Sequence, residues 1–177
     1  MNETQTYKNL KDKPQNNFPE MIIVHHGGGT DANPLLDTSN QTAQIYEAYH
    51  LSKGWDGLGY QYVIHKNGDI WKGRPEHRNG AHTVGQNEKS IGICLVGNFD
   101  ATLPTLEQKN ALIGLFNAIR VRYPAIGDKI YPHRKFATKT CYGTKLSDTW
   151  ARDLVSEAVP IDKEKIKEQI ISLVKML

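Results

Sequence analysis

The sequence predicts a single-domain α/β protein in which a central mixed β-sheet is flanked by helices. Short apolar stretches rich in β-branched residues alternate along the chain with longer stretches in which apolar residues recur every three or four positions. Two of the short stretches are separated only by a tight-turn sequence, which indicates a hairpin. Strands that alternate with helices and include one hairpin are typical of a mixed sheet covered by helices.

The size and composition exclude several other classes of protein. A chain of 177 residues is long enough to bury a substantial core within one domain. Its residues are 38% hydrophobic and 23% charged, which excludes collagen-like, disulfide-scaffold and largely disordered chains. The net charge of +3 is too small to indicate nucleic-acid binding, and it gives only weak support for an anionic polymer as a substrate. The glycines at 27–29 do not indicate a nucleotide-binding loop, because no Gly-Lys-Ser/Thr follows them.

An arm, a strand and a helix are expected first. Residues 1–20 are polar and contain two prolines, so we expect a loosely held arm. Residues 21–26 form a near-continuous apolar run, which is typical of a central strand covered on both faces. Residues 37–39 offer caps for a helix that Gly54 ends. The apolar stripe of this helix consists of Ile45, Tyr46, Tyr49 and Leu51.

A hairpin and a buried strand are expected in the middle of the chain. Residues 60–65 and 70–72 are aromatic and β-branched, and the sequence Lys66-Asn67-Gly68-Asp69 between them predicts a type I′ turn. A loop follows, and residues 90–96 then form a second apolar run, which we expect to be buried. Cys94 lies inside this run and is therefore expected to be a core thiol.

Helices dominate the second half of the chain. Residues 104–108 have the sequence of a capping box, and the helix that they begin is expected to end at Tyr123-Pro124. Its inward-facing residues are expected to be Leu112, Ile113, Leu115, Phe116 and Ile119. Residues 130–131 form a short strand, and residues 148–159 and 163–177 have helical patterns.

The chain therefore divides into an arm of residues 1–20, a main domain of residues 21–159 and a C-terminal helix within residues 160–177. Basic and acidic residues offset each other in this last helix, so stable membrane insertion is not expected. The apolar runs are too short for a membrane span. The first residues have no apolar segment of the secretory type, so we expect synthesis in the cytoplasm without a signal peptide.

The strongest chemical signal lies in residues 132–141. His133 and Cys141 stand eight residues apart there, and Lys139 precedes the cysteine by two. An imidazole and a thiol on one loop suggest two soft zinc ligands, with a third from elsewhere and a fourth position left for water. The apolar run of residues 21–26 supplies the third, because it ends at two histidines, 25 and 26. Neighbouring residues of a strand point to opposite faces, so at most one of the two joins the site.

Two other interpretations of these residues stay open at this point. The spacing of His133, Cys141 and a strand histidine is not specific, so they are also compatible with ordinary polar residues in loops. Cys141 with His133 is also compatible with a cysteine hydrolase, which needs no metal.

The remaining histidines are expected in different environments. His50 and His77 stand in polar surroundings and are expected at the surface. His65 ends a hairpin strand, so a structural role is favoured. His82 lies in a loop between Gly80 and Gly85, where a core role is not expected, and it is therefore a pocket candidate.

Six motifs appear along the chain in a familiar order. They are Val24-His25-His26, residues 59–64, Gly73-Arg74, Gly80-Ala81-His82-Thr83, residues 90–97, and His133 followed by Lys139-Thr140-Cys141. In this order and spacing the chain resembles the type 2 N-acetylmuramoyl-L-alanine amidases and the peptidoglycan recognition proteins. Within this family it looks most like the short amidase-type lysozymes of bacteriophages. The resemblance covers roughly residues 20–155.

The resemblance implies that residues 21–159 are a zinc amidase domain with one Zn²⁺ per chain. His25, His133 and Cys141 match the metal ligands. Tyr60 and Lys139 match catalytic residues, and they would stabilise the negative charge of a tetrahedral intermediate and share proton transfer.

Substrate binding is expected from two further residues. His82 matches a histidine that lines the substrate groove, and it is also expected to assist proton transfer. Arg74 is a candidate for holding a stem-peptide carboxylate through two N–H groups, with a surface arginine as the alternative. One departure concerns the residue after the zinc cysteine, which is proline in many relatives and Tyr142 here.

The function implied by the resemblance is hydrolysis of the amide bond between N-acetylmuramic acid and L-alanine in bacterial peptidoglycan. We expect a monomeric phage endolysin that stays in the host cytoplasm until a holin lets it reach the cell wall. The alternatives are a cytoplasmic muropeptide-recycling amidase, a generic zinc peptidase, and a peptidoglycan-binding protein with little catalysis. Proteins of the last kind typically replace the zinc cysteine, which this chain keeps at Cys141. Some phage lysozymes of this kind also bind the host RNA polymerase, and the sequence leaves this open.

Overall fold

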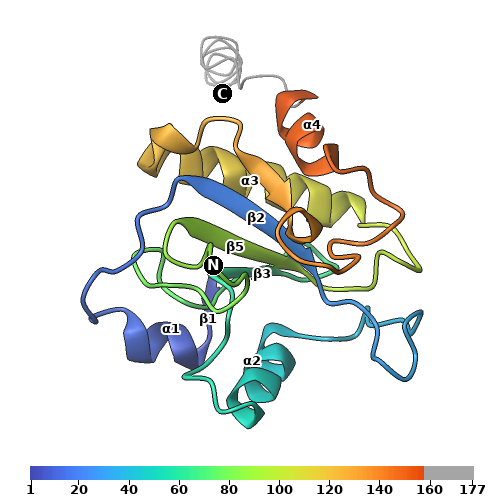
Figure 1. Cartoon of the computed structure of the whole chain (residues 1–177), viewed down its shortest axis with the longest axis horizontal. Coiled ribbons are helices and arrows are strands. Elements are labelled where there is room, and N and C mark those ends of the chain that lie inside the picture. The colour runs from blue at the N-terminus through green and yellow to red at the C-terminus, as the bar shows by residue number, and fades with distance from the viewer. Residues whose placement is uncertain (158–177) are drawn as a thin grey trace, which may run out of the picture.

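A six-stranded mixed β-sheet with helices on both faces forms the scaffold of the protein (Figure 1). The computed structural model describes residues 1–157, so the helix expected over residues 163–177 lies outside the described residues. The elements are β1 (Asn2–Glu3), α1 (Gln5–Leu10), β2 (Met21–His26), α2 (Ala43–Ser52), β3 (Tyr62–Ile64), β4 (Ile70–Lys72), β5 (Ser90–Leu95), α3 (Leu106–Arg122), η1 (Pro124–Ile126), β6 (Ile130–Pro132), η2 (His133–Lys135) and α4 (Trp150–Glu157). The strand order is β1-β4-β3-β5-β2-β6, and the expected α/β class is confirmed.

Strand β2 occupies the interior position that its apolar sequence predicts. Strands β5 and β6 pair with it on its two sides, both in parallel, and the antiparallel β3–β4 hairpin extends the sheet beyond β5. In this register His25 lies beside Cys94, and His26 lies beside Leu95. Because side chains alternate between the faces of a sheet, His25 shares one face with Cys94, and His26 shares the other face with Leu95.

Helices lie on both faces of the sheet (Figure 1), and each face carries its own core. Helices α3 and α4 cover the face of Leu95, and this larger core includes Val24, Ile93 and Phe116. Helix α2 covers the opposite face, where a smaller core contains Ala43, Leu58, Val63, Cys94 and Val96. Cys94 is fully buried, as expected. Within residues 1–157, none of the helices has the length and apolar character needed to cross a bilayer.

Helix α3 begins and ends where the sequence predicts. The Thr105 hydroxyl accepts the Gln108 N–H group (3.1 Å), and the Gln108 side chain accepts the Thr105 N–H group (3.2 Å), which completes a capping box. The buried Gln108 amide also donates to the Val96 carbonyl (2.9 Å), so the cap ties α3 to the end of β5. Four of the five residues expected to face inward are buried, and Ile113 is half-buried.

Helix α2 differs from the prediction in its start and in its buried face. Thr42 caps it in place of residues 37–39, because the Thr42 hydroxyl accepts the Ile45 N–H group (3.3 Å). Three members of the expected apolar stripe are exposed, namely Ile45, Tyr49 and Leu51. Glu47 and His50 are buried instead, since each accepts a hydrogen bond from another segment. Apolar periodicity does not detect such partners.

The β3–β4 hairpin forms as expected, but its turn is of a different type. A type I′ turn needs a positive φ at Asn67, whereas only glycines have a positive φ among the described residues, and Gly68 has φ 84°. The Gly68 N–H group donates to the His65 carbonyl (2.9 Å), and the His65 N–H group donates to the Asp69 carbonyl (2.9 Å). These bonds enclose a three-residue loop that ends with glycine in the left-handed region.

The first 17 residues fold against the sheet, so the expectation of a loosely held arm is wrong. Strand β1 pairs in parallel with β4. The Thr6 N–H and hydroxyl groups both donate to the Glu47 carboxylate, and the Thr6 hydroxyl also accepts the Leu58 N–H group (2.8 Å). Asn17 is fully buried, and its amide donates to the Ser90 carbonyl (3.0 Å). The polar residues of this segment therefore bind the rest of the protein.

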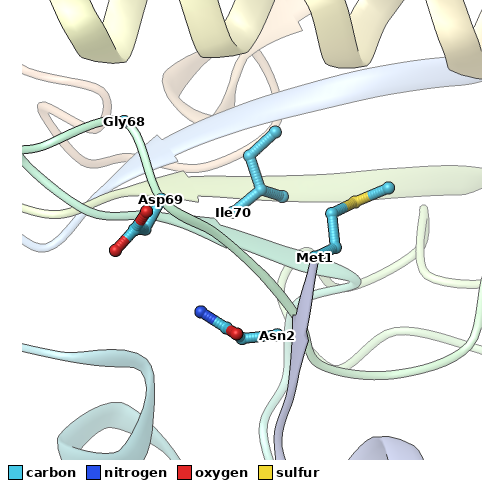
Figure 2. Close-up of a pocket in the computed structure, with 5 residues that line it drawn as sticks. All are labelled: Met1, Asn2, Gly68, Asp69 and Ile70. Atoms are coloured by element: carbon cyan, nitrogen blue, oxygen red, sulfur yellow. The ribbon is translucent and has the colours of Figure 1, made fainter.

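A shallow cavity of about 340 Å³ lies where β1 meets the hairpin (Figure 2). Its lining residues are Met1, Asn2, Gly68, Asp69 and Ile70. None of the site residues expected from the sequence lines this cavity, so it is not the site of the expected chemistry.

Substitution of Thr6 by valine tests the attachment of the N-terminal segment. The variant keeps the shape of the side chain but leaves the buried Leu58 N–H group without its acceptor. We expect the free energy of unfolding to fall by about 1–3 kcal/mol, measured by denaturant titration. Thr138→Val, at an exposed threonine, is the control and should change it by less than about 0.5 kcal/mol. If Thr6→Val is as stable as the wild type, Thr6 does not hold the segment in place.

Candidate metal centre

Three side chains from separate segments meet beside the end of β2. His25 comes from β2, His133 begins η2 directly after β6, and Cys141 lies on the loop that follows η2. The potential ligand atoms of these residues all lie within 4.8 Å of one another. Cys141 Sγ is 3.8 Å from His25 Nδ1, and the His25 and His133 ring centroids are 4.4 Å apart. The structure thus brings together the three residues that the sequence resemblance implies as ligands.

The spacing and the chemistry of this group fit a zinc ion. A nitrogen and a sulfur ligand that bind zinc tetrahedrally lie about 3.6 Å apart. The 3.8 Å between Cys141 Sγ and His25 Nδ1 is close to this value. Two imidazoles and a thiol are also donors that suit zinc better than calcium or magnesium.

Burial keeps the three donors uncharged when no cation is bound. It lowers the pKa of His25 well below its usual value, and His82 and His133 lower it further. Burial, with a contribution from Lys139, lowers the pKa of His133 to about 4. Burial also raises the pKa of the Cys141 thiol to about 12. The imidazoles therefore keep their lone pairs free at neutral pH, whereas a metal ion must displace the thiol proton.

The same pKa argues against Cys141 as a nucleophile. Catalytic cysteines need a lowered pKa, because the thiolate is the reactive form. At Cys141 burial has the opposite effect, and the adjacent Lys139 does not reverse it. The cysteine-hydrolase interpretation is therefore disfavoured.

The neighbouring His26 lies on the opposite face of the sheet and belongs to the scaffold. Its Nδ1 atom accepts the Phe99 N–H group (2.9 Å), and its Nε2 atom lies 3.9 Å from the Asp100 carboxylate. Burial lowers the pKa of His26 to about 4. The structure therefore places the His25 ring, and not the His26 ring, in the group of three.

His82 contacts the side of His25 that faces away from Cys141. The His82 Nδ1 atom is 3.0 Å from His25 Nε2, and the two rings meet edge to face. The Thr83 hydroxyl lies 3.0 Å from His82 Nδ1 and 3.4 Å from His25 Nε2. Metal-binding histidines commonly use their second nitrogen for such a contact, which fixes the orientation of the ring. Thr83 belongs to one of the six motifs, but the sequence assigns it no role, because nothing local indicates this contact.

Two glycines make room for the His82 ring. A Cβ atom at Gly92 on β5 would lie 2.5 Å from His82 Cδ2, and one at Gly80 would lie 2.4 Å from the same atom. The Asn87 side chain accepts the N–H groups of His82 and Thr83, both at 2.9 Å. The loop of His82 is therefore held by its own hydrogen bonds as well as by the sheet.

Tyr60 lies beside His25 in the segment that leads into β3. The centroids of the two rings are 5.1 Å apart. Burial raises the pKa of Tyr60 well above its usual value, and the Cys94 and Cys141 thiols raise it further. The hydroxyl group therefore stays protonated and is able to donate a hydrogen bond.

His50 supports the segment that carries Tyr60, so its expected place at the surface is wrong. The residue is only 7% exposed. Its Nδ1 atom accepts the Gly59 N–H group (3.1 Å), and its ring stacks on Trp55 with the centroids 4.5 Å apart. Because the acceptor is used by a backbone group from another segment, the polar sequence around His50 did not reveal the contact.

Lys139 is exposed on the loop between His133 and Cys141. Its positive charge lowers the pKa of both residues, so the ammonium group lies near the group of three. Exposure leaves this charge accessible to a substrate that covers the site.

Arg74 is held by the fold. The residue is 6% exposed, and its guanidinium group donates to the carbonyls of Leu58 (2.8 Å) and Asn79 (3.2 Å) and pairs with the Asp56 carboxylate. These contacts occupy the groups that would hold a substrate carboxylate. They support a structural role for Arg74. The alternative expected from the sequence was an arginine at the surface, whereas Arg74 is buried.

Arg134 and Tyr142 stabilise the loop of Cys141, and neither was predicted from the sequence. The Arg134 guanidinium donates to the carbonyls of Gly143 (2.7 Å) and Leu146 (2.7 Å). Tyr142, which follows Cys141 across a cis peptide bond, is fully buried, and its hydroxyl donates to the Ser147 carbonyl (2.9 Å). The loop is therefore well packed at the position where the sequence departs from the family pattern. Backbone carbonyls accept these bonds, so the sequence carries no signal for them.

A substitution at Gly92 tests the space occupied by His82. Gly92→Ala places a methyl group against the His82 ring, so we expect the free energy of unfolding to fall by about 1–3 kcal/mol. In a His82→Ala background the same substitution should cost much less, and a double-mutant cycle by denaturant unfolding measures the difference. Gly114→Ala, where the added Cβ meets no atom within 4 Å, is the control. Equal costs in both backgrounds would show that the ring does not require the glycine.

Comparisons with known proteins point to one family. The family model for N-acetylmuramoyl-L-alanine amidase matches residues 15–144. Peptidoglycan-recognition protein SC2 of Drosophila melanogaster is 31% identical over 140 residues, which cover 76% of each chain. The endolysin of Enterobacteria phage K11 is 35% identical over 98 residues, which cover 52% of this chain and 64% of the endolysin. Among solved structures, N-acetylmuramoyl-L-alanine amidase LysC from Clostridium intestinale has 28% identity and a TM-score of 0.72, and the match covers 88% of this chain and 96% of LysC.

The residues matched by the family model include all three members of the group of three. The family match extends from before β2 to beyond Cys141, so it contains His25, His133 and Cys141. The fold also agrees with that of the matched amidase structure over most of the chain. The chain therefore belongs to the N-acetylmuramoyl-L-alanine amidase family, as its motifs predict.

Proposed function

We propose that this protein is a zinc-dependent amidase that cleaves the bond between N-acetylmuramic acid and L-alanine in peptidoglycan. The observation that carries the proposal is the convergence of His25, His133 and Cys141 in a chain of the amidase family. Three protein ligands with a fourth position left open are typical of catalytic zinc sites, whereas structural sites use four. The names of the peptidoglycan-recognition protein and of the LysC amidase support the substrate class.

The side chains around the group of three supply the other parts of the reaction. A zinc ion bound there would polarise the amide carbonyl and lower the pKa of water. Tyr60 stays protonated, so it donates a hydrogen bond to the carbonyl oxygen as negative charge develops on it. Lys139 adds positive charge from the exposed side of the site. Both groups also carry protons, which the departing amine of L-alanine needs.

His82 is assigned to the positioning of His25. Its Nδ1 atom is engaged with His25 and Thr83, and its ring fills the space above Gly92. These contacts support a role in orienting a ligand, in place of the expected contact with the glycopeptide. Proton transfer is then left to Tyr60 and Lys139.

We further propose that the enzyme acts as a phage endolysin. The similarity to the endolysin of phage K11 supports this role. In that role the protein works as a monomer on the host cell wall, which it reaches from the cytoplasm through a holin. A muropeptide-recycling amidase would cleave the same bond, but it would act on soluble muropeptides and not on intact cell walls. The presence of Cys141 in the group of three favours either enzyme over a protein that only binds peptidoglycan.

Digestion of purified peptidoglycan identifies the bond that is cleaved. We expect mass spectrometry to find free stem peptides that begin with L-alanine, together with glycan strands of unchanged length. Cys141→Ser removes one proposed ligand, so it should release no stem peptides and retain less zinc. New reducing sugar ends would indicate a glycosidase, and cuts inside the stem would indicate a peptidase. Either pattern would contradict the amidase proposal.

Variants of Tyr60 and Lys139 separate catalysis from metal binding. Tyr60→Phe and Lys139→Ala each remove a group that stabilises the transition state, so turnover should fall roughly 100- to 1,000-fold. Elemental analysis should still find about one zinc per chain, because neither residue is a proposed ligand. Tyr49→Phe and Lys145→Ala, at exposed positions, are the matched controls and should retain wild-type turnover. A Lys139→Ala enzyme with wild-type turnover would remove that lysine from the mechanism.

A further inference from the structure

The loop that carries Cys141 rests on a carboxylate that the mechanism above does not use. Asp100 lies in the connection between β5 and α3. Its Oδ2 atom accepts the Thr140 hydroxyl (2.8 Å), and its Oδ1 atom accepts the Thr144 backbone N–H group (2.8 Å). Thr140 directly precedes Cys141, and Thr144 follows it in the same loop. One carboxylate therefore holds the chain on both sides of the cysteine.

His26 links the same carboxylate to Cys141 from the end of β2. The His26 backbone N–H group donates to Cys141 Sγ (3.4 Å). The His26 Nδ1 atom accepts the Phe99 N–H group, so the proton of the neutral ring is on Nε2, which lies 3.9 Å from Asp100 Oδ2. Asp100 is therefore connected to Cys141 in two ways, through Thr140 and through His26.

Contacts outside the group of three hold the segment that contains Asp100. The Asn98 side chain accepts the Asp100 N–H group (3.1 Å) and donates to the carbonyls of Pro34 (2.8 Å) and Leu36 (3.0 Å). The Cys141 loop also packs tightly on this segment, because a Cβ atom at Gly143 would lie 2.4 Å from the Phe99 backbone. The position of the Asp100 carboxylate is therefore fixed, so its hydrogen bonds can hold the Cys141 loop in place.

We propose that Asp100 is a positioning residue that holds Cys141 at the distance from His25 and His133 that metal binding requires. This inference rests on the proposed zinc site. The Asp100 side chain accepts hydrogen bonds from the residues on both sides of the cysteine. It acts through its two hydrogen bonds, which restrict the Cys141 loop before the metal binds and so reduce the entropy lost on binding.

Three variants at this contact test the proposal. Asp100→Ala removes both acceptors, and we expect the zinc dissociation constant, measured by competition with a chelator, to rise roughly 10- to 100-fold. Thr140→Val removes one of the two bonds without changing shape, so its dissociation constant should rise by less. Asp100→Asn keeps an acceptor for Thr144 N–H and offers a donor to the Thr140 hydroxyl, so it should retain most of the affinity. Asp128→Asn and Thr138→Val, at exposed positions, are the matched controls and should bind zinc like the wild type.

Cobalt substitution and thiol reactivity report on Cys141 itself. In cobalt-loaded Asp100→Ala we expect the thiolate-to-cobalt absorption band to weaken or shift, because the sulfur is no longer held in place. In the metal-free variant a thiol reagent should modify Cys141 faster than in the wild type, whereas the fully buried Cys94 should stay protected. A change in folding stability alone would produce neither pattern in folded protein.

The possible outcomes separate this inference from the proposed function. Unchanged zinc affinity and an unchanged cobalt spectrum in folded Asp100→Ala would overturn the role of Asp100, even if the variant is less stable. If circular dichroism shows that Asp100→Ala does not fold, Thr140→Val decides, and wild-type affinity in that variant would overturn the proposal. Wild-type protein that binds no zinc would instead overturn the proposed function. Wild-type protein that binds zinc and cleaves peptidoglycan, with unaffected variants, would overturn only this inference.

Discussion

The alternation of side chains at the end of β2 is the constraint on which the whole site depends. His25 and His26 point to opposite faces of the sheet. The first joins His133 and Cys141, while the second binds the connection that follows β5 and contacts Cys141 through its backbone. A slip of one residue in the register would exchange the two rings and break both sets of contacts. Pairing with β5 along the whole length of β2 prevents such a slip.

The group of three, His25, His133 and Cys141, lies over one face of the sheet. This position requires space on the neighbouring strand β5. Gly92 provides it, because the His82 ring occupies the volume where a side chain would lie. Two residues further along the same face, Cys94 lies beside His25 and close enough to Tyr60 to raise the pKa of its hydroxyl. Small side chains on β5 therefore let His82 and Tyr60 approach His25 from two loops. Larger side chains at Gly92 and Cys94 would occupy the space that the His82 and Tyr60 rings now take.

Much of the fold could be predicted because its signals are local, and most of the errors concern contacts between distant segments. The capping box of α3 and the apolar run of β2 are short-range patterns, and both are confirmed. The buried faces of α1 and α2 were missed because they depend on hydrogen bonds such as that from Thr6 to Glu47. In the site, the family resemblance named the three residues that meet at β2. It gave no indication of Asp100, whose partner Thr140 lies 40 residues further along the chain.

The three proposed ligands are uncharged when buried, so their burial does not require a bound cation. Two neutral imidazoles and a protonated thiol can be buried without the cost of an isolated buried charge. Cys141 packs against the larger core, and that core is built mainly from the sheet, α3 and α4. The fold therefore does not need a metal to complete its core, in contrast to small zinc domains, in which metal binding supplies the free energy of folding. Ligands held in place by the fold can bind zinc through three donors and leave the fourth position open, which is the arrangement that hydrolysis requires.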